Sequence, residues 1–363
     1  MDFPIPATPT AVTADWLTGA LRATGALRAG AARNVRPVPV GTNAGFTGQI
    51  ARLEVDYDVA EPGVPARLVI KLAPANEKDR ALGAVLRMFE REVCFYREIG
   101  PRAGIRVPRC YYGAADRSGG GGVLLLEDLA PARPGDQLAG WSVEKARTAL
   151  RHLARLHARW WERDELAHLA WLPSADDRRA AAIAAQAYEA AWQPFLERFG
   201  DALPARIRQV GARLGAAIAP LLEGFATAPT TMMHGDYRMD NLFFGEEPDS
   251  LAVIDWQLAC RGRGIFDVAY FLSQSAPPAR RRKHEHELLA LYSQTLRDNG
   301  VAMEAPEGIL EDYRKGVLYG LIYPVIVGGT VADADLSPTG TVHTAADRVA
   351  QAIMDLEADR YLE

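Results

Sequence analysis

Residues 232–257, MMHGDYRMDNLFFGEEPDSLAVIDWQ, place four polar side chains at spacings that could support chemistry. Asp236 and Asn241 are five positions apart, and Asp255 ends the second of two short apolar runs. If these runs pair as a hairpin, Asp255 comes next to Asn241. One carboxylate and one amide oxygen are hard ligands, and together they suit Mg²⁺ that also binds a phosphate chain. Asp236 then remains to accept a proton from an attacking hydroxyl group, and Asp240 is interpreted as a bystander.

The same residues carry a family resemblance. The order Asp-x4-Asn followed by Asp is that of the protein-kinase catalytic loop and its metal-binding aspartate. The fuller pattern HGDYRMDNLFF, VIDWQ and GIFDVAYFL resembles the aminoglycoside phosphotransferase and choline kinase superfamily, nearest to its ecdysteroid-kinase-like branches. The resemblance implies ATP and Mg²⁺ as cofactors, Asp236 as the catalytic base, and Asn241 and Asp255 as metal ligands. It also implies that His234 and Asp267 brace the catalytic loop.

A kinase of this kind needs a lysine on the third strand of its small lobe, to hold the α- and β-phosphates. Lys71 in LVIKLA fits this role if residues 35–40 form the first strand. A glutamate on the following helix should pair with the lysine. We expect Glu92, while Glu90, on a different face of the same helix, stays open as an alternative.

Two further segments are expected to contact the nucleotide. The stretch GTNAGFTG precedes a strand, as a phosphate-covering turn should, although its spacing departs from the G-x-G-x-x-G pattern. The stretch LLLEDLA resembles the hinge whose backbone meets adenine. The residues predicted to bind the nucleotide here are Gly41, Thr42, Asn43, Gly45, Glu127 and Leu129.

The elements that must position these residues change character along the chain. Residues 51–57 alternate apolar and polar side chains, which is typical of a half-buried strand, and residues 81–100 have helical periodicity. After residue 129 the sequence is alanine-rich and mostly helical. We therefore expect an α+β, two-lobed, protein-kinase-like fold. Residues 1–127 would form a nucleotide-binding lobe of antiparallel sheet with one helix, and residues 128–363 a larger helical lobe for catalysis and substrate binding.

The acceptor is expected to be a small molecule. Only 11 residues separate Asp255 from Asp267, which leaves no room for the long activation segment on which peptide substrates dock. The later helices offer aromatic side chains but no cluster of acids for a polycation. A neutral or partly apolar hydroxyl compound is therefore preferred to an aminoglycoside. The aromatic residues of these later helices are Trp160, Trp161, Trp171, Tyr188, Trp192, Tyr319 and Tyr323.

The alternative from another functional class is a pseudokinase-like module that binds a nucleotide without catalysing a reaction.

Composition sets the remaining expectations. The net charge of −5 gives no basic field for nucleic acid, so no nucleic-acid partner is expected. Three dispersed cysteines give neither a disulfide framework nor a metal-ligand spacing. The longest uncharged run is 17 residues and contains proline, so no membrane span is expected. These observations favour a cytoplasmic monomer or homodimer.

Overall fold

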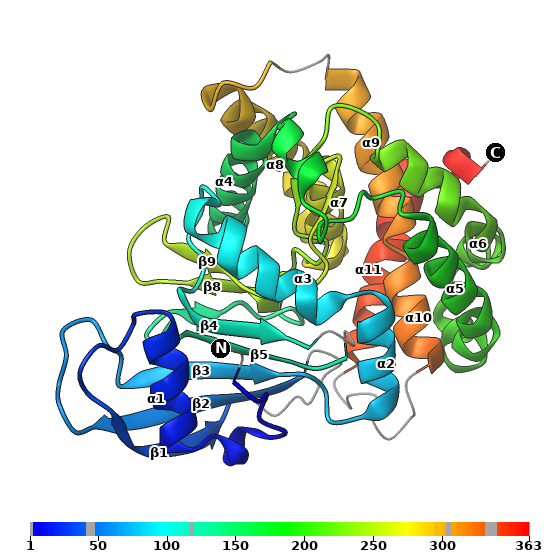
Figure 1. Cartoon of the computed structure of the whole chain (residues 1–363). Coiled ribbons are helices and arrows are strands. Elements are labelled where there is room, and N and C mark those ends of the chain that lie inside the picture. Colours follow the sequence, from blue (N-terminus) through cyan, green and yellow to red (C-terminus); the bar gives the residue numbers. More distant parts are fainter. Residues whose placement is uncertain (1–2, 41–47, 117–119, 303–305, 331–339, 363) are drawn as a thin grey trace. The chain divides into compact units, whose positions relative to one another are not determined.

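The chain forms two compact units (Figure 1). The computed structural model describes residues 3–40, 48–116, 120–302, 306–330 and 340–362. Unit 1 comprises Met1–Arg133 together with Ala252–Leu258, and unit 2 comprises Pro134–Leu251 together with Ala259–Glu363. The structure thus differs from the division at residue 127, which placed all of 128–363 in one domain.

The segment Ala252–Leu258 joins unit 1 through specific contacts. The Val253 amide donates to the Arg106 carbonyl at 3.0 Å. The Trp256 ring stacks on Phe95, with the ring centroids 3.8 Å apart. Neither contact is visible in the local sequence pattern.

Unit 1 is built on a five-stranded antiparallel sheet whose strand order is β1-β2-β3-β5-β4. Alternate residues of the strands face a core that α1 (Ala14–Ala23) covers. Thr13 caps α1 by accepting from the Trp16 amide at 3.1 Å. The strands are β1 (Ala32–Pro39), β2 (Gln49–Tyr57), β3 (Arg67–Leu72), β4 (Cys110–Ala115) and β5 (Gly122–Glu127).

The helical segment between β3 and β4 is broken, where the periodicity predicted one helix over 81–100. It consists of α2 (Glu77–Val85), α3 (Met88–Cys94) and a π-helical turn, Phe95–Ile99. Arg87 takes the left-handed conformation with φ 52°, which ends the first helix and redirects the chain. The segment predicted as one helix is therefore two helices followed by a π-helical turn.

Unit 2 is mainly helical, and residues 234–241 lie between two of its short strands. Ser142 caps α4 by accepting from the Lys145 amide at 3.2 Å. The helices are α4 (Val143–Trp160), α5 (Arg178–Phe199), α6 (Ala205–Phe225), α7 (Ile265–Gln274), α8 (Pro278–Asp298), α9 (Pro306–Tyr319), α10 (Ile322–Thr330) and α11 (Thr341–Leu356). The short strands are β6 (Arg133–Pro134), β7 (Thr231–Met233), β8 (Leu242–Phe244), β9 (Leu251–Val253) and β10 (Cys260–Gly262), of which β6 and β9 also include residues of unit 1.

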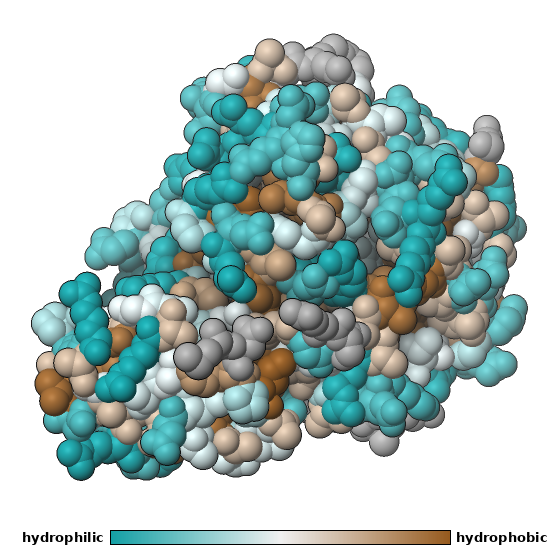
Figure 2. Space-filling view, in the orientation of Figure 1, coloured by the Kyte–Doolittle hydropathy of each residue, from teal (hydrophilic) through white to brown (hydrophobic). Residues whose placement is uncertain are grey.

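The face in Figure 2 is mostly hydrophilic, and hydrophobic residues gather on it in small areas. Within the described ranges, no helix is both long enough and apolar enough to cross a membrane. The antiparallel sheet followed by a mainly helical remainder confirms the predicted α+β class.

Candidate active site

Lys71 is held between two carboxylates inside unit 1. On β3, Ile70 and Leu72 face the core under α1, so the alternation of the strand turns Lys71 to the opposite face. Its Nζ lies 2.7 Å from Glu92 Oε2 and 2.8 Å from Asp255 Oδ1. All three side chains are buried. The group can therefore present a fixed ammonium beside a fixed carboxylate.

Burial and the neighbouring charges shift the pKa values of Lys71 and Glu92. Burial would lower the pKa of Lys71, but the neighbouring Asp255 and Glu92 carboxylates raise it above its ordinary value. Burial, opposed by Lys71 and reinforced by Asp255, raises the pKa of Glu92. The Asp255 carboxyl group offers hard oxygen ligands beside the Lys71 ammonium, so the residues present fit Mg²⁺ bound together with a phosphate chain.

The structure distinguishes the two glutamates of α3. Glu92 contacts Lys71, whereas Glu90 pairs with Arg87 at 2.7 Å on the exposed side of the helix. The Lys71–Glu92 pair is the one that we preferred from the sequence. Its role toward a nucleotide stays a prediction.

Asp255 has an unusual backbone. Its φ is 66°, in the left-handed region that aspartate tolerates better than most residues. The neighbouring Trp256 fixes this turn, because its ring stacks on Phe95 and its Nε1 donates to the Val253 carbonyl at 3.2 Å. Backbone strain of this kind gathers at functional sites.

The predicted phosphate-covering residues Gly41, Thr42, Asn43 and Gly45 lie outside the described residues. Gly48, at the end of the same stretch, has a φ of 114°. A Cβ atom there would lie 2.2 Å from the Leu72 carbonyl oxygen, so the close approach to β3 requires glycine.

The predicted adenine contacts lie at and after the end of β5. The Glu127 side chain pairs with Arg106 at 2.5 Å and accepts from the Arg109 amide at 3.0 Å, while its own amide donates to the Arg109 carbonyl. The Leu129 carbonyl accepts from the Ala132 amide at 2.9 Å. These bonds fix the backbone of the segment, and contact with adenine stays a prediction.

In unit 2, Asp267 fixes the start of the predicted catalytic loop, residues 234–241. This fully buried carboxylate accepts from the amides of His234 at 2.7 Å and Gly235 at 2.9 Å. It also lies 3.3 Å from Nε2 of the buried His157. The His234 ring in turn accepts from the Asp236 amide at 3.1 Å. The expectation that Asp267 and His234 brace this loop is confirmed, and His157 is a packed core residue.

Asp236 and Asn241 contact each other directly. The Asn241 amide nitrogen donates to the Asp236 carbonyl at 2.9 Å and to Asp236 Oδ2 at 3.0 Å. Because both amide hydrogens are directed to Asp236, Asn241 Oδ1 points away from it, as a metal ligand requires. Arg238 also donates to Asp236 Oδ2, at 3.2 Å, and contacts Asp240 at 3.1 Å.

Tyr270 is a site residue that the sequence reasoning missed. It lies on α7, and the neighbouring Asp236 carboxylate adds to burial in raising the pKa of its phenol. The Tyr270 ring packs edge-on against Tyr323, with the ring centroids 4.8 Å apart. Only its place three positions after Asp267 in GIFDVAYFL, one helical turn along, could have identified it.

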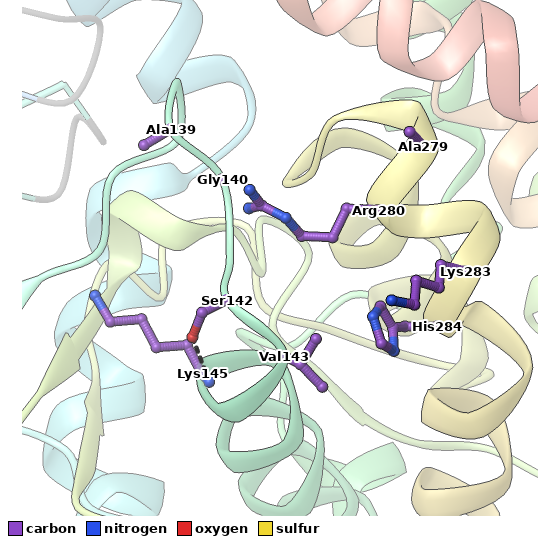
Figure 3. A pocket seen from close by; sticks show the side chains of 9 residues that line it. All are labelled: Ala139, Gly140, Ser142, Val143, Lys145, Ala279, Arg280, Lys283 and His284. Carbon is purple, nitrogen blue, oxygen red and sulfur yellow. Dashed lines mark hydrogen bonds between the residues drawn. The ribbon is translucent and has the colours of Figure 1, made fainter.

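A pocket of about 700 Å³ lies elsewhere in unit 2, between the starts of α4 and α8 (Figure 3). Arg280, Lys283 and His284 give its α8 side a basic character. Arg280 also donates to the Trp141 carbonyl at 2.6 Å. No residue of the stretch 234–241 lines this pocket, so the pocket is separate from the predicted catalytic loop.

Several solved structures share this fold. A Ralstonia eutropha protein assigned to the aminoglycoside phosphotransferases has a TM-score of 0.55 at 17% identity, with 95% of this chain and 97% of that chain covered. An ethanolamine kinase from Plasmodium vivax has a TM-score of 0.52 at 11% identity, over 90% and 84% of the two chains. A spectinomycin phosphotransferase has a TM-score of 0.51 at 11% identity, over 96% and 99%. They confirm the predicted protein-kinase-like fold.

Two sequence comparisons add to this. A stretch of 42 residues is 52% identical to acyl-CoA dehydrogenase family member 10 from Mus musculus, but it spans only 11% of this chain and 4% of that protein. Residues 42–303, more than half of the chain, match the ecdysteroid kinase-like family. The chain therefore belongs to the ecdysteroid kinase-like family.

Proposed function

We propose that this protein transfers the γ-phosphoryl group of ATP to a hydroxyl group of a small molecule. The observation that carries the proposal is Lys71, buried between Glu92 and Asp255 at 2.7 and 2.8 Å. A lysine fixed by a helix glutamate beside a metal-binding aspartate is the arrangement with which kinases hold ATP phosphates. Family membership supports the same activity.

Each site residue has a distinct task in this reaction. Lys71 binds phosphate oxygens of ATP, and Asn241 and Asp255 would hold Mg²⁺, which when bound neutralises phosphate charge. Asp236 orients the acceptor hydroxyl and takes its proton. The hydroxyl oxygen bonds to the γ-phosphorus while the bond between that phosphorus and the β–γ bridging oxygen breaks. The products are ADP and a phosphate monoester.

The surroundings of Asp236 favour a neutral or partly apolar acceptor. The Arg238 guanidinium, 3.2 Å from the Asp236 carboxylate, would repel an acceptor that carries several positive charges. The aromatic pair Tyr270 and Tyr323 lies on the α7 and α10 side of Asp236. An alcohol with an apolar face could pack on such rings, whereas a polycationic aminoglycoside would need acidic neighbours.

The proposal is tested by measuring ADP release and nucleotide binding together. Wild-type protein with Mg-ATP is assayed against sugars, amino alcohols, aminoglycosides and steroid-like alcohols, with Asp236→Ala in parallel. We expect turnover with one acceptor class, and a loss of ~10²–10⁴-fold in Asp236→Ala with ATP affinity retained. Asp201→Ala, an exposed carboxylate in unit 2, is the matched control and should retain full turnover.

Two outcomes would contradict the proposal. Tight ATP binding without turnover on any acceptor would support the non-catalytic module. A preference for aminoglycosides over neutral alcohols would overturn the proposed acceptor class while leaving the kinase activity in place.

A further inference from the structure

The stretch 134–138 lies along the catalytic loop of unit 2. The Gly135 amide donates to the Leu242 carbonyl at 2.8 Å. A Cβ atom on Gly135 would lie 2.5 Å from Met239 Cε and 2.6 Å from the Met239 carbonyl oxygen. The stretch therefore approaches the loop so closely that only glycine fits at this position.

Gln137 bonds the loop with its backbone and its side chain. Its amide donates to Asp240 Oδ1 at 3.1 Å, and its Oε1 accepts from the Met239 amide at 3.0 Å. Asp240, interpreted as a bystander from the sequence, is thus a partner of Gln137 and of Arg238. Met239 lies between the base Asp236 and the metal ligand Asn241, so Gln137 holds the middle of the loop.

The other bonds of Gln137 tie it to the end of α7. Its Nε2 donates to the Gln274 carbonyl at 3.0 Å, and its Oε1 also accepts from Ser275 Oγ at 3.0 Å. α7 also carries Asp267, the carboxylate that fixes His234 and Gly235. One helix therefore supports the loop at its start through Asp267 and at its middle through Gln137.

A buried arginine from α11 locks this arrangement. Arg348 donates to the carbonyls of Gln137 at 2.6 Å, Leu138 at 2.6 Å and Gln274 at 3.0 Å. Burial lowers the pKa of Arg348, which reflects the cost of enclosing a cation among carbonyl groups.

We propose that Gln137 is a positioning residue for the catalytic loop: it sets the place of Met239, and through it the places of Asp236 and Asn241. Only the predicted effect on kcat rests on the proposed kinase activity; the effect on the loop itself does not. Gln137 acts through the loop backbone, and its loss should lower kcat more than it changes the KM for ATP. A displacement of about 1 Å in a catalytic group can cost on the order of a hundredfold in rate.

Two substitutions separate positioning from packing. Gln137→Met keeps the length of the side chain but removes every side-chain hydrogen bond. Gln137→Glu keeps an oxygen for the Met239 amide and replaces the donor to the Gln274 carbonyl with a second oxygen. Gln294→Met, on the exposed face of α8, is the matched control. Ser275→Ala removes one bond to Gln137 Oε1 and serves as the milder variant if Gln137→Met folds poorly.

The first measurement is peptide-resolved hydrogen exchange over residues 236–242, which needs no turnover. We expect exchange about tenfold faster in Gln137→Met, an intermediate increase in Ser275→Ala, and wild-type exchange in Gln294→Met. The second is kcat with the acceptor found for the wild type, expected to fall ten- to a hundredfold in Gln137→Met and to recover largely in Gln137→Glu.

The outcomes are distinguishable. Wild-type exchange in Gln137→Met, or equal losses of kcat in Gln137→Met and Gln137→Glu, would overturn the positioning role. An inactive wild-type protein whose loop is nonetheless loosened by Gln137→Met would overturn the kinase proposal and leave the structural part of this inference standing.

Discussion

Asp267 offers the sharpest test of how the catalytic loop is held. Its buried carboxylate accepts from the His234 and Gly235 amides at 2.7 and 2.9 Å, and His157 lies 3.3 Å away. In Asp267→Ala both amides lose their partner inside the protein. Each unpaired buried donor costs about 1–3 kcal/mol, so we expect a loss of about 2–6 kcal/mol in the free energy of unfolding of unit 2.

Asp267→Asn refines the estimate. The asparagine keeps one acceptor oxygen and presents a donor group where the second amide needs an acceptor. One buried donor is then unsatisfied, and we expect a loss of about 1–3 kcal/mol. Asp298→Asn, on the exposed end of α8, is the matched control and should change stability by less than about 0.5 kcal/mol.

The assay is urea unfolding, with peptide-resolved hydrogen exchange assigning the loss to residues 231–241. Because the chain has two compact units, the exchange data decide which unfolding transition belongs to unit 2. The reasoning would be refuted if Asp267→Asn unfolded like the control and the exchange of the His234 and Gly235 amides were unchanged.

Three further predictions concern single residues. Lys71→Met leaves two buried carboxylates without their cation, so unit 1 should lose about 3–5 kcal/mol in urea unfolding; an unchanged midpoint would contradict the buried pairing. Gly48→Ala places a Cβ atom 2.2 Å from the Leu72 carbonyl oxygen at a φ of 114°, so its Tm should fall, whereas Gly63→Ala has open space and should lose less. Burial raises the pKa of Asp249, but hydrogen bonds from Arg151 and Arg155 outweigh it and lower the pKa below 3.8. The stability from Asp249 is thus present above its ordinary pKa and is lost as pH falls through the lowered value. In Asp249→Asn the free energy of unfolding should therefore fall less than in the wild type as the pH is lowered. An unchanged pH dependence of the free energy of unfolding at acid pH would contradict this.

Much of the site could be predicted because its residues lie in short local patterns. Asp236 and Asn241 are read from one loop, and Lys71 from one strand whose apolar neighbours alternate with it. The sequence favours Glu92 as the partner of Lys71 but does not exclude Glu90, because the two glutamates differ only in which face of the helix turns to the sheet. The structure decides it through Arg87, which pairs with Glu90.

The rest depends on contacts that no local pattern contains. The helix break at Arg87 occurs at a residue that is neither glycine nor proline, so the sequence does not indicate it. Gln137 and Met239 are 102 positions apart, and Arg348 reaches Gln137 from 211 positions away. From the sequence alone, Gln137 is a polar residue after a proline-rich stretch, which is typical of an exposed loop. Supporting residues of this kind become visible only in the folded chain.

The central claim is that the chain transfers a phosphoryl group to a small hydroxyl compound and that Asp236 assists the transfer. The most direct measurement is mass spectrometry of the acceptor after incubation with Mg-ATP, for wild type and Asp236→Ala at equal nucleotide occupancy. The account predicts an acceptor heavier by one phosphoryl group with the wild type and none detectable with Asp236→Ala over the same time. Equal phosphorylation by both proteins would contradict it.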